Sequence, residues 1–199
     1  MMKLFTKPGE AFKGIKKVKG SGRAIGILAI AAIIFAIVGV IGATALYKIV
    51  PELPMAAGAG AGIAAVVTFL VIFIGGLFFA WLLQTTMNTL GCKGNYNSGL
   101  VPVAYPLLIL SVSNLISAVL NYVPVIGGVL AFLVTIILTV MAFALTYRAI
   151  KEMFATDMIT AFIGLLVLWG AAVAAGVYAG TIGVIGTIGK IPFLAWFGL

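Results

Sequence analysis

The stretch LGCKGNYNSGLVPVAYP, residues 90–106, interrupts a chain that is otherwise almost continuously apolar. Its first half is polar and contains glycines, asparagines and Lys93, and its second half contains two prolines. Gly91, Gly94 and the asparagines favour turn conformations that β-branched residues resist. The stretch therefore predicts a short polar turn, over residues 91–98, between two apolar helices.

The segments on both sides of this turn are long enough to cross a membrane. Of the 199 residues, 64% are hydrophobic and 8% are charged, whereas about a quarter of the residues in an ordinary soluble domain are charged. A helix needs about 20 mainly apolar residues to cross a hydrocarbon core of about 30 Å. The sequence therefore predicts an all-α integral membrane protein, a five-span helical bundle within a lipid bilayer. The expected spans are 24–47, 61–87, 100–121, 124–147 and 158–178.

Both ends of the chain differ in composition from this predicted membrane domain, 24–178. Residues 1–23 carry seven of the twelve lysines and arginines, which predicts a basic cytoplasmic or interfacial segment that attracts anionic lipid headgroups. A basic flank beside a span is typical of a topology signal, so we expect no nucleic-acid partner. Residues 179–199 form a glycine-rich and aromatic tail, and we expect the fifth helix to break or fray near its glycines.

The lysines and arginines also predict an orientation, because cytoplasmic loops of membrane proteins are enriched in them. If the N-terminus is cytoplasmic, that side collects ten cations, including Lys93, Arg148 and Lys151. The opposite side then has only Lys48 and Lys190. The alternation predicts a cytoplasmic N-terminus and an external C-terminus.

Few groups that could perform catalysis are present. The chain has one cysteine and no histidine, which excludes an internal disulfide and predicts no Cys/His metal site and no cofactor. Its four carboxylates, Glu10, Glu52, Glu152 and Asp157, all fall in predicted flanks or loops. We therefore expect no catalytic residues, and the protein is not expected to be an enzyme.

Hydroxyl and amide side chains recur along two predicted spans. Their spacing places each set roughly on one helix face, where they would hydrogen-bond between helices or line a polar path for a solute or a lipid headgroup. Small residues along the spans would permit close helix packing or formation of a homo-oligomer. The candidate polar residues are Ser111, Asn114 and Asn121 on the third span and Thr135 and Thr139 on the fourth.

A mixed-charge cluster follows the fourth span, in the run YRAIKEMFATD, residues 147–157. Arg148 and Glu152 are about one helical turn apart and could form a pair. The cluster is either a solvated loop at the membrane surface or a cytoplasmic docking surface. In the second interpretation, the docking residues are Lys16, Lys17, Lys19, Arg148 and Lys151.

The order of these features resembles that of the Yip1-domain family of five-span membrane proteins. Pro8 and Phe12 precede the first span, a Pro-Gly turn precedes the fourth, and an arginine- and lysine-bearing loop follows it. The most specific match is the block 90–106, in which the family's glycine, lysine and glycine are followed by a tyrosine-proline pair. The residues that carry this match are Gly91, Lys93, Gly94, Tyr105 and Pro106.

The resemblance implies a polytopic, non-enzymatic protein with a cytoplasmic N-terminus. Eukaryotic relatives act in vesicle trafficking and contact Rab-type GTPases, and some prokaryotic relatives are associated with export systems. This chain lacks the long acidic N-terminal region of the eukaryotic pattern, which favours a prokaryotic member in the plasma membrane with unknown membrane or cytoplasmic protein partners. The expected function is a scaffold or adaptor in membrane organisation, trafficking or export-complex assembly. The alternative is a small transporter, channel or lipid-translocating subunit.

The two prolines predict a rigid elbow at the start of the third span. Pro102 is expected in the first helical turn, where its missing N–H costs little. Pro106, four residues later, would remove an internal hydrogen bond and kink the helix. Pro106→Ala is therefore expected to alter assembly or partner binding more than membrane insertion.

Overall fold

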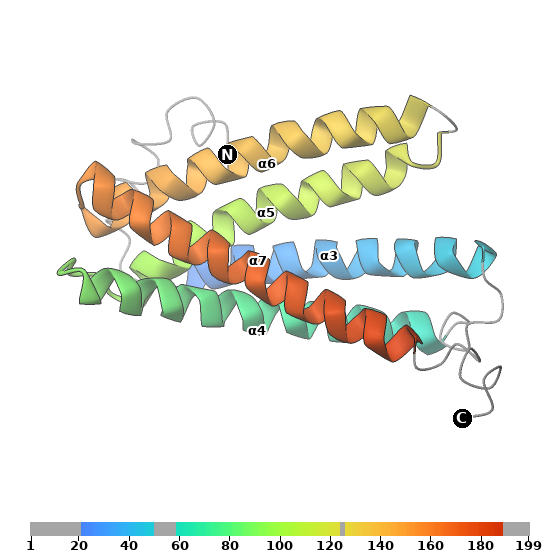
Figure 1. Ribbon diagram of the computed structural model, residues 1–199, viewed down its shortest axis with the longest axis horizontal. Coiled ribbons are helices and arrows are strands. Elements are labelled where there is room, and N and C mark those ends of the chain that lie inside the picture. The colour runs from blue at the N-terminus through green and yellow to red at the C-terminus, as the bar shows by residue number, and fades with distance from the viewer. Residues whose placement is uncertain (1–20, 50–58, 124–125, 189–199) are drawn as a thin grey trace.

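The computed structural model describes residues 21–49, 59–123 and 126–188, and the regular structure within these residues is entirely helical. Each of the five helices contains a stretch long and apolar enough to cross a membrane. The prediction of an all-α fold with five membrane-spanning helices is therefore confirmed. The helices are α3 (Gly22–Ile49), α4 (Ala59–Thr89), α5 (Tyr96–Leu120), α6 (Ile126–Phe154) and α7 (Met158–Ile188) (Figure 1).

Three helix boundaries differ from the sequence-based predictions. Helix α5 begins at Tyr96, so the turn is shorter than predicted and Pro102 lies beyond the first helical turn. Helix α6 continues to Phe154, so Arg148 and Lys151 lie on a helix and not in a loop. Helix α7 runs without a break from Met158 to Ile188, past the expected end of the fifth span at residue 178, and it ends next to Gly189, among the glycines where a break or a frayed end was expected. In lipid, an unbroken helix satisfies its backbone polar groups internally, which offsets the low helix propensity of glycine.

Several predictions fall outside the described residues. They concern the basic segment with Lys16, Lys17 and Lys19, and the aromatic end of the tail.

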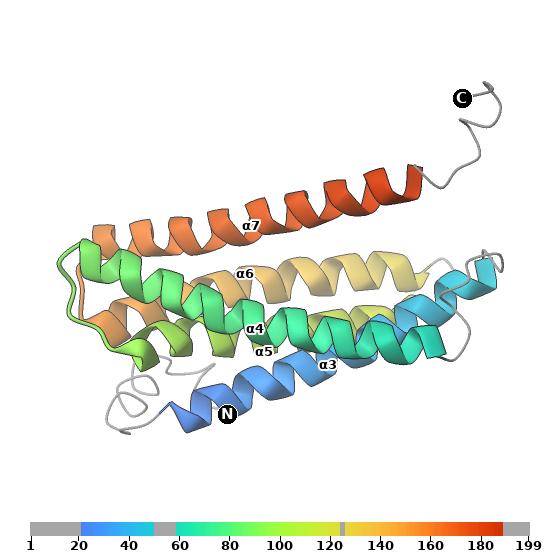
Figure 2. The same cartoon turned by 90° about the horizontal axis from the view of Figure 1, so that it is seen from below.

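Each helix runs antiparallel to the helix that precedes it in the chain (Figure 1). Helices α3, α5 and α7 begin at the end of the bundle where α4 and α6 finish. We call this the charged end, because most of the charged residues in the described segments lie there. Helix α7 crosses the other four helices diagonally in Figure 1 and forms a separate layer in Figure 2, where it packs mainly on α4 and α6. The charged end carries Arg23, Lys93, Arg148, Lys151, Glu152 and Asp157, whereas Lys48 lies in the last turn of α3 at the opposite end.

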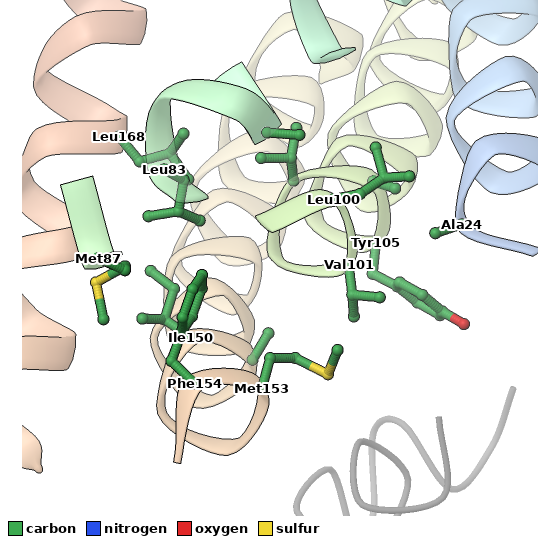
Figure 3. Close-up of a cluster of buried hydrophobic side chains, with 14 of the residues drawn as sticks. Ala24, Leu83, Met87, Leu100, Val101, Tyr105, Ile150, Met153, Phe154 and Leu168 are labelled. Carbon is green, nitrogen blue, oxygen red and sulfur yellow. The ribbon is translucent and has the colours of Figure 1, made fainter. Parts of the chain in front are cut away.

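The buried core is concentrated near the charged end (Figure 3). In α5, every residue from Ser98 to Pro106 is buried. This half of α5 is therefore enclosed on all sides by its neighbours. The core is completed by residues such as Leu28 of α3, Leu83 and Met87 of α4, Ile150 and Phe154 of α6, and Leu165 of α7.

Close helix contacts near this core depend on glycine. A Cβ atom at Gly99 of α5 would overlap the backbone carbonyl of Ala80 in α4, and one at Gly164 of α7 would overlap the Met87 sulfur. In contrast, the space around Gly75 and Gly170 is open. Glycine therefore sets the separation of α4 and α5 at Gly99, where the overlapping atom belongs to the backbone, and it has no such role at Gly75 or Gly170.

Candidate functional site

The connection between α4 and α5, residues 90–95, lies at the charged end and begins with a specific helix termination. The Gly91 N–H donates to the Asn88 carbonyl at 3.0 Å, and the Cys92 N–H donates to the Met87 carbonyl at 3.0 Å. Gly91 has a φ of 85°, a left-handed conformation that side chains with a Cβ rarely adopt. This hydrogen-bond pattern is the Schellman motif that closes many helices. The predicted role of Gly91 as a turn residue thus has a defined conformational cause.

The second half of the connection starts α5. The Asn95 side-chain oxygen accepts hydrogen bonds from the Ser98 N–H and the Ser98 hydroxyl, both at 3.0 Å. Asn95 is therefore the N-cap of α5, a role that asparagine fills well because it satisfies a free helix N–H. The Gly94 N–H donates to the Asn88 side-chain oxygen at 3.2 Å. Lys93, between these fixed residues, is exposed.

The 90–95 connection also packs on the turn between α6 and α7. Gly94 lies against the Phe154 ring so closely that a Cβ atom would overlap it. The Cys92 thiol donates to the Thr156 hydroxyl at 3.3 Å, and this hydroxyl donates to the Asp157 carboxylate at 3.3 Å. These contacts join two connections that are about sixty residues apart in the sequence. Phe154 and Thr156 were not among the predicted site residues.

The start of α5 is anchored to its neighbours by tyrosines. The Tyr96 hydroxyl donates to the Leu77 carbonyl of α4 at 3.1 Å. Tyr105 is 6% exposed, and in Figure 3 its ring extends toward Ala24 at the start of α3. Pro106, the next residue, is buried inside the same helix. The predicted elbow residues therefore lie in the enclosed half of α5, whereas Lys93 faces outward.

A cavity of about 290 Å³ lies where α6 ends and α7 begins. Arg148 and Lys151 line it and are exposed, so its rim has two positive charges, and Glu152 adds one negative charge to the same walls. Tyr147 also lines the cavity, and its hydroxyl oxygen is buried without a hydrogen-bond partner. Glu152 and Met158 complete the walls. The two exposed cations can bind an anionic group at this position.

Asp157 caps the start of α7 beside this cavity. A hydrogen bond from the Thr160 side chain, supported by those from the Thr156 side chain and the backbone, holds the pKa of this carboxyl below its usual value. The ionised carboxylate at a helix N-terminus also interacts favourably with the helix dipole. Asp157 therefore acts as a structural cap in the turn.

The predicted polar residues of the spans differ in burial and in hydrogen-bond partners. Ser111 is buried and its hydroxyl donates to the Leu108 carbonyl, whereas Asn114 is exposed and its amide donates to the Leu110 carbonyl. The hydroxyls of Ser117 and Thr135 are 2.9 Å apart and link α5 to α6. Of the remaining candidates, Asn121 caps the end of α5 and Thr139 is half-buried in α6.

Among the residues that the structure describes, no three histidine, cysteine or acidic side chains come together as a possible metal site. The candidate site is thus a protein surface built from exposed cations, a cavity lined by charged side chains and two connections that pack on each other.

Comparison with known proteins identifies a matching protein family. The family model described as the Yip1 domain matches residues 2–180. Neither a curated protein nor a solved structure gives a significant match to the chain.

Proposed function

Because the chain belongs to the Yip1 domain family, we propose that it is a non-enzymatic membrane scaffold or adaptor. In this proposal the charged end faces the cytoplasm of a prokaryotic cell. There it binds anionic lipid headgroups and partner proteins, in membrane organisation, trafficking or export-complex assembly.

The observation that supports the proposal is that the exposed cations and the packed core lie at the same end of the bundle. Arg23, Lys93, Arg148 and Lys151 are exposed at one end of the bundle, and the hydrophobic core of buried side chains lies beneath them. A cationic surface on a rigid base suits recognition, because little conformational entropy is lost when a partner binds. The charge distribution also favours the cytoplasmic side of a membrane.

The cavity beside Tyr147 supplies a place where such a partner can bind. Arg148 offers a planar set of donors suited to a phosphate or a carboxylate, and Lys151 adds a second positive charge. Lipid headgroups and acidic protein segments both carry such groups. Lys16, Lys17 and Lys19 remain a predicted part of the same surface.

A transporter, channel or lipid-translocating subunit receives less support from the contacts. Its path would be lined by the polar residues of α5 and α6. However, Ser111 and Asn114 hydrogen-bond within their own helix, and Ser117 and Thr135 hydrogen-bond to each other. These bonds fit helix packing better than solute binding.

The test is affinity purification of the full chain in mild detergent, followed by mass spectrometry of the co-purifying proteins. The test variant carries Arg148→Gln and Lys151→Gln, and the matched control carries Lys48→Gln at the opposite end of the bundle. We expect the first to lose partners that the second retains. A third variant, with Lys16, Lys17 and Lys19 changed to Gln, is expected to bind the same partners more weakly. If every partner is retained in the first and third variants, the charged end is not the docking surface.

A further inference from the structure

A second cavity lies within the membrane-spanning part of the bundle, away from the charged surface. It has a volume of about 130 Å³ and lies between α5 and α7, with contributions from α4 and α6. We call it the α5–α7 crevice. Its walls include Phe79, Pro106, Leu110, Thr146, Trp169 and Ala172.

The path of α7 explains why the crevice exists. Helix α7 packs mainly on α4 and α6 and crosses the bundle diagonally as a separate layer (Figures 1 and 2). The Trp169 ring packs on Phe143 of α6, with ring centroids 5.5 Å apart. This contact supports α7 from the side of α6, and the face of α5 that contains Pro106 and Leu110 forms the opposite wall.

The crevice is chemically unsuited to water. Its walls are almost entirely apolar, and the Thr146 hydroxyl is already donated to the Ala142 carbonyl at 2.8 Å. A buried water needs at least two polar partners, and an apolar cavity of about 150 Å³ in another protein stays dry and binds benzene. An empty space would also leave its walls without dispersion contacts. An apolar group of a few carbon atoms is therefore the suitable occupant.

The crevice is continuous with the surface that faces lipid. Leu107, Leu110 and Trp169 in its walls are only half-buried, and Ala172 is exposed. All of the lining residues lie in helix segments that are long and apolar enough to cross a membrane. The groups that surround such segments in a bilayer are the hydrocarbon chains of lipids.

We propose that the α5–α7 crevice binds a hydrocarbon chain of a bilayer lipid, which completes the packing of α7 on α5. Association inside a bilayer depends on close packing and not on removal of apolar surface from water. The chain therefore binds because its shape fills the crevice. This site does not depend on the partners of the charged end.

Trp169 provides a direct measurement, because bromine atoms quench tryptophan fluorescence on contact. Trp81 and Trp196 are changed to Phe so that Trp169 is the only tryptophan. The full chain is then reconstituted into phosphatidylcholine vesicles with or without bromine on the inner half of the acyl chains. We expect Trp169 to lose most of its emission in the brominated vesicles. An unquenched Trp169 in this parent protein would overturn the proposal.

A pair of neighbouring variants separates a chain in the crevice from lipid at the outer surface. Ala172→Phe places a ring in the crevice and is expected to restore most of the emission. Val173→Phe, at a position that is 62% exposed, should leave the quenching unchanged. Leu110→Phe fills the crevice from α5 and is expected to act like Ala172→Phe, provided that circular dichroism shows unchanged helix content. Equal quenching in folded Ala172→Phe and Val173→Phe would show that lipid reaches Trp169 by another route and would refute the proposed site.

Discussion

Gly99 is the residue at which the sequence most directly limits the packing of two helices. It is buried, and a Cβ atom there would overlap the Ala80 carbonyl of α4. A backbone carbonyl cannot move away as the end of a flexible side chain can. We expect Gly99→Ala to force α4 and α5 apart and to lower the free energy of unfolding by about 1–3 kcal/mol.

Gly170→Ala provides the matched control, because nothing lies within 4 Å of the position that its Cβ would occupy. Alanine is a better helix former than glycine by about 0.5–1 kcal/mol in a helix interior, so this variant should be as stable as the parent or slightly more stable. Thermal unfolding in detergent, followed by circular dichroism, compares the two. Similar melting temperatures for both variants would contradict the proposed close contact.

At the scale of the element, the start of α5 is capped by one side-chain amide, that of Asn95. Asn95 accepts two hydrogen bonds from Ser98, so Asn95→Ala should lower the free energy of unfolding by about 1 kcal/mol. Asn95→Asp keeps an acceptor oxygen and should retain most of the stability. Denaturant or thermal unfolding of the three proteins measures the difference. Equal losses in the Ala and Asp variants would argue against the cap.

The start of α7 gives a prediction that depends on pH. The folded-state pKa of Asp157 is lowered below its usual value of 3.8, so ionised Asp157 stabilises the folded state above that value. The contribution is lost as pH falls through the lowered folded-state pKa. The melting temperature of the parent should therefore exceed that of Asp157→Ala at neutral pH, and the difference should shrink below about pH 4. A constant difference across this range would show that the carboxylate charge is unimportant.

The sequence was sufficient to predict the five helices, because uncharged runs of this length have few alternatives to a membrane helix. The prediction was wrong at the end of α6, where Arg148 and Lys151 suggested a loop and the helix in fact continues to Phe154. The spacing of Ala149, Ile150, Met153 and Phe154, all buried, has the helical period and could have extended the prediction. The contact between Gly94 and Phe154 could not be predicted, because a single sequence does not reveal which distant residues pack together.

At the scale of the whole molecule, the proposed function places the charged end in the cytoplasm. This orientation can be measured by chemical labelling. In a Cys92→Ser background, Lys93→Cys places a thiol at the charged end and Tyr122→Cys places one at the opposite end, where Tyr122 is 61% exposed. A membrane-impermeant maleimide should label Tyr122→Cys in intact cells and Lys93→Cys only after the cells are opened. Labelling of Lys93→Cys in intact cells would place the charged end outside and reject the cytoplasmic docking surface.

Because the core is concentrated near the charged end, the two ends of the bundle should resist mechanical unfolding to different degrees. In the described part of α3, the buried side chains end at Ala32, and in α7 they end at Leu168. Between residues 170 and 177 the side chains of α7 are half-buried or exposed, so this part of α7 loses few contacts with the bundle when it is pulled away, and segments with few buried contacts separate at low free energy. A molecule pulled out of a bilayer from its C-terminal end should yield gradually along α7, and then resist sharply when the load reaches the region around Leu165.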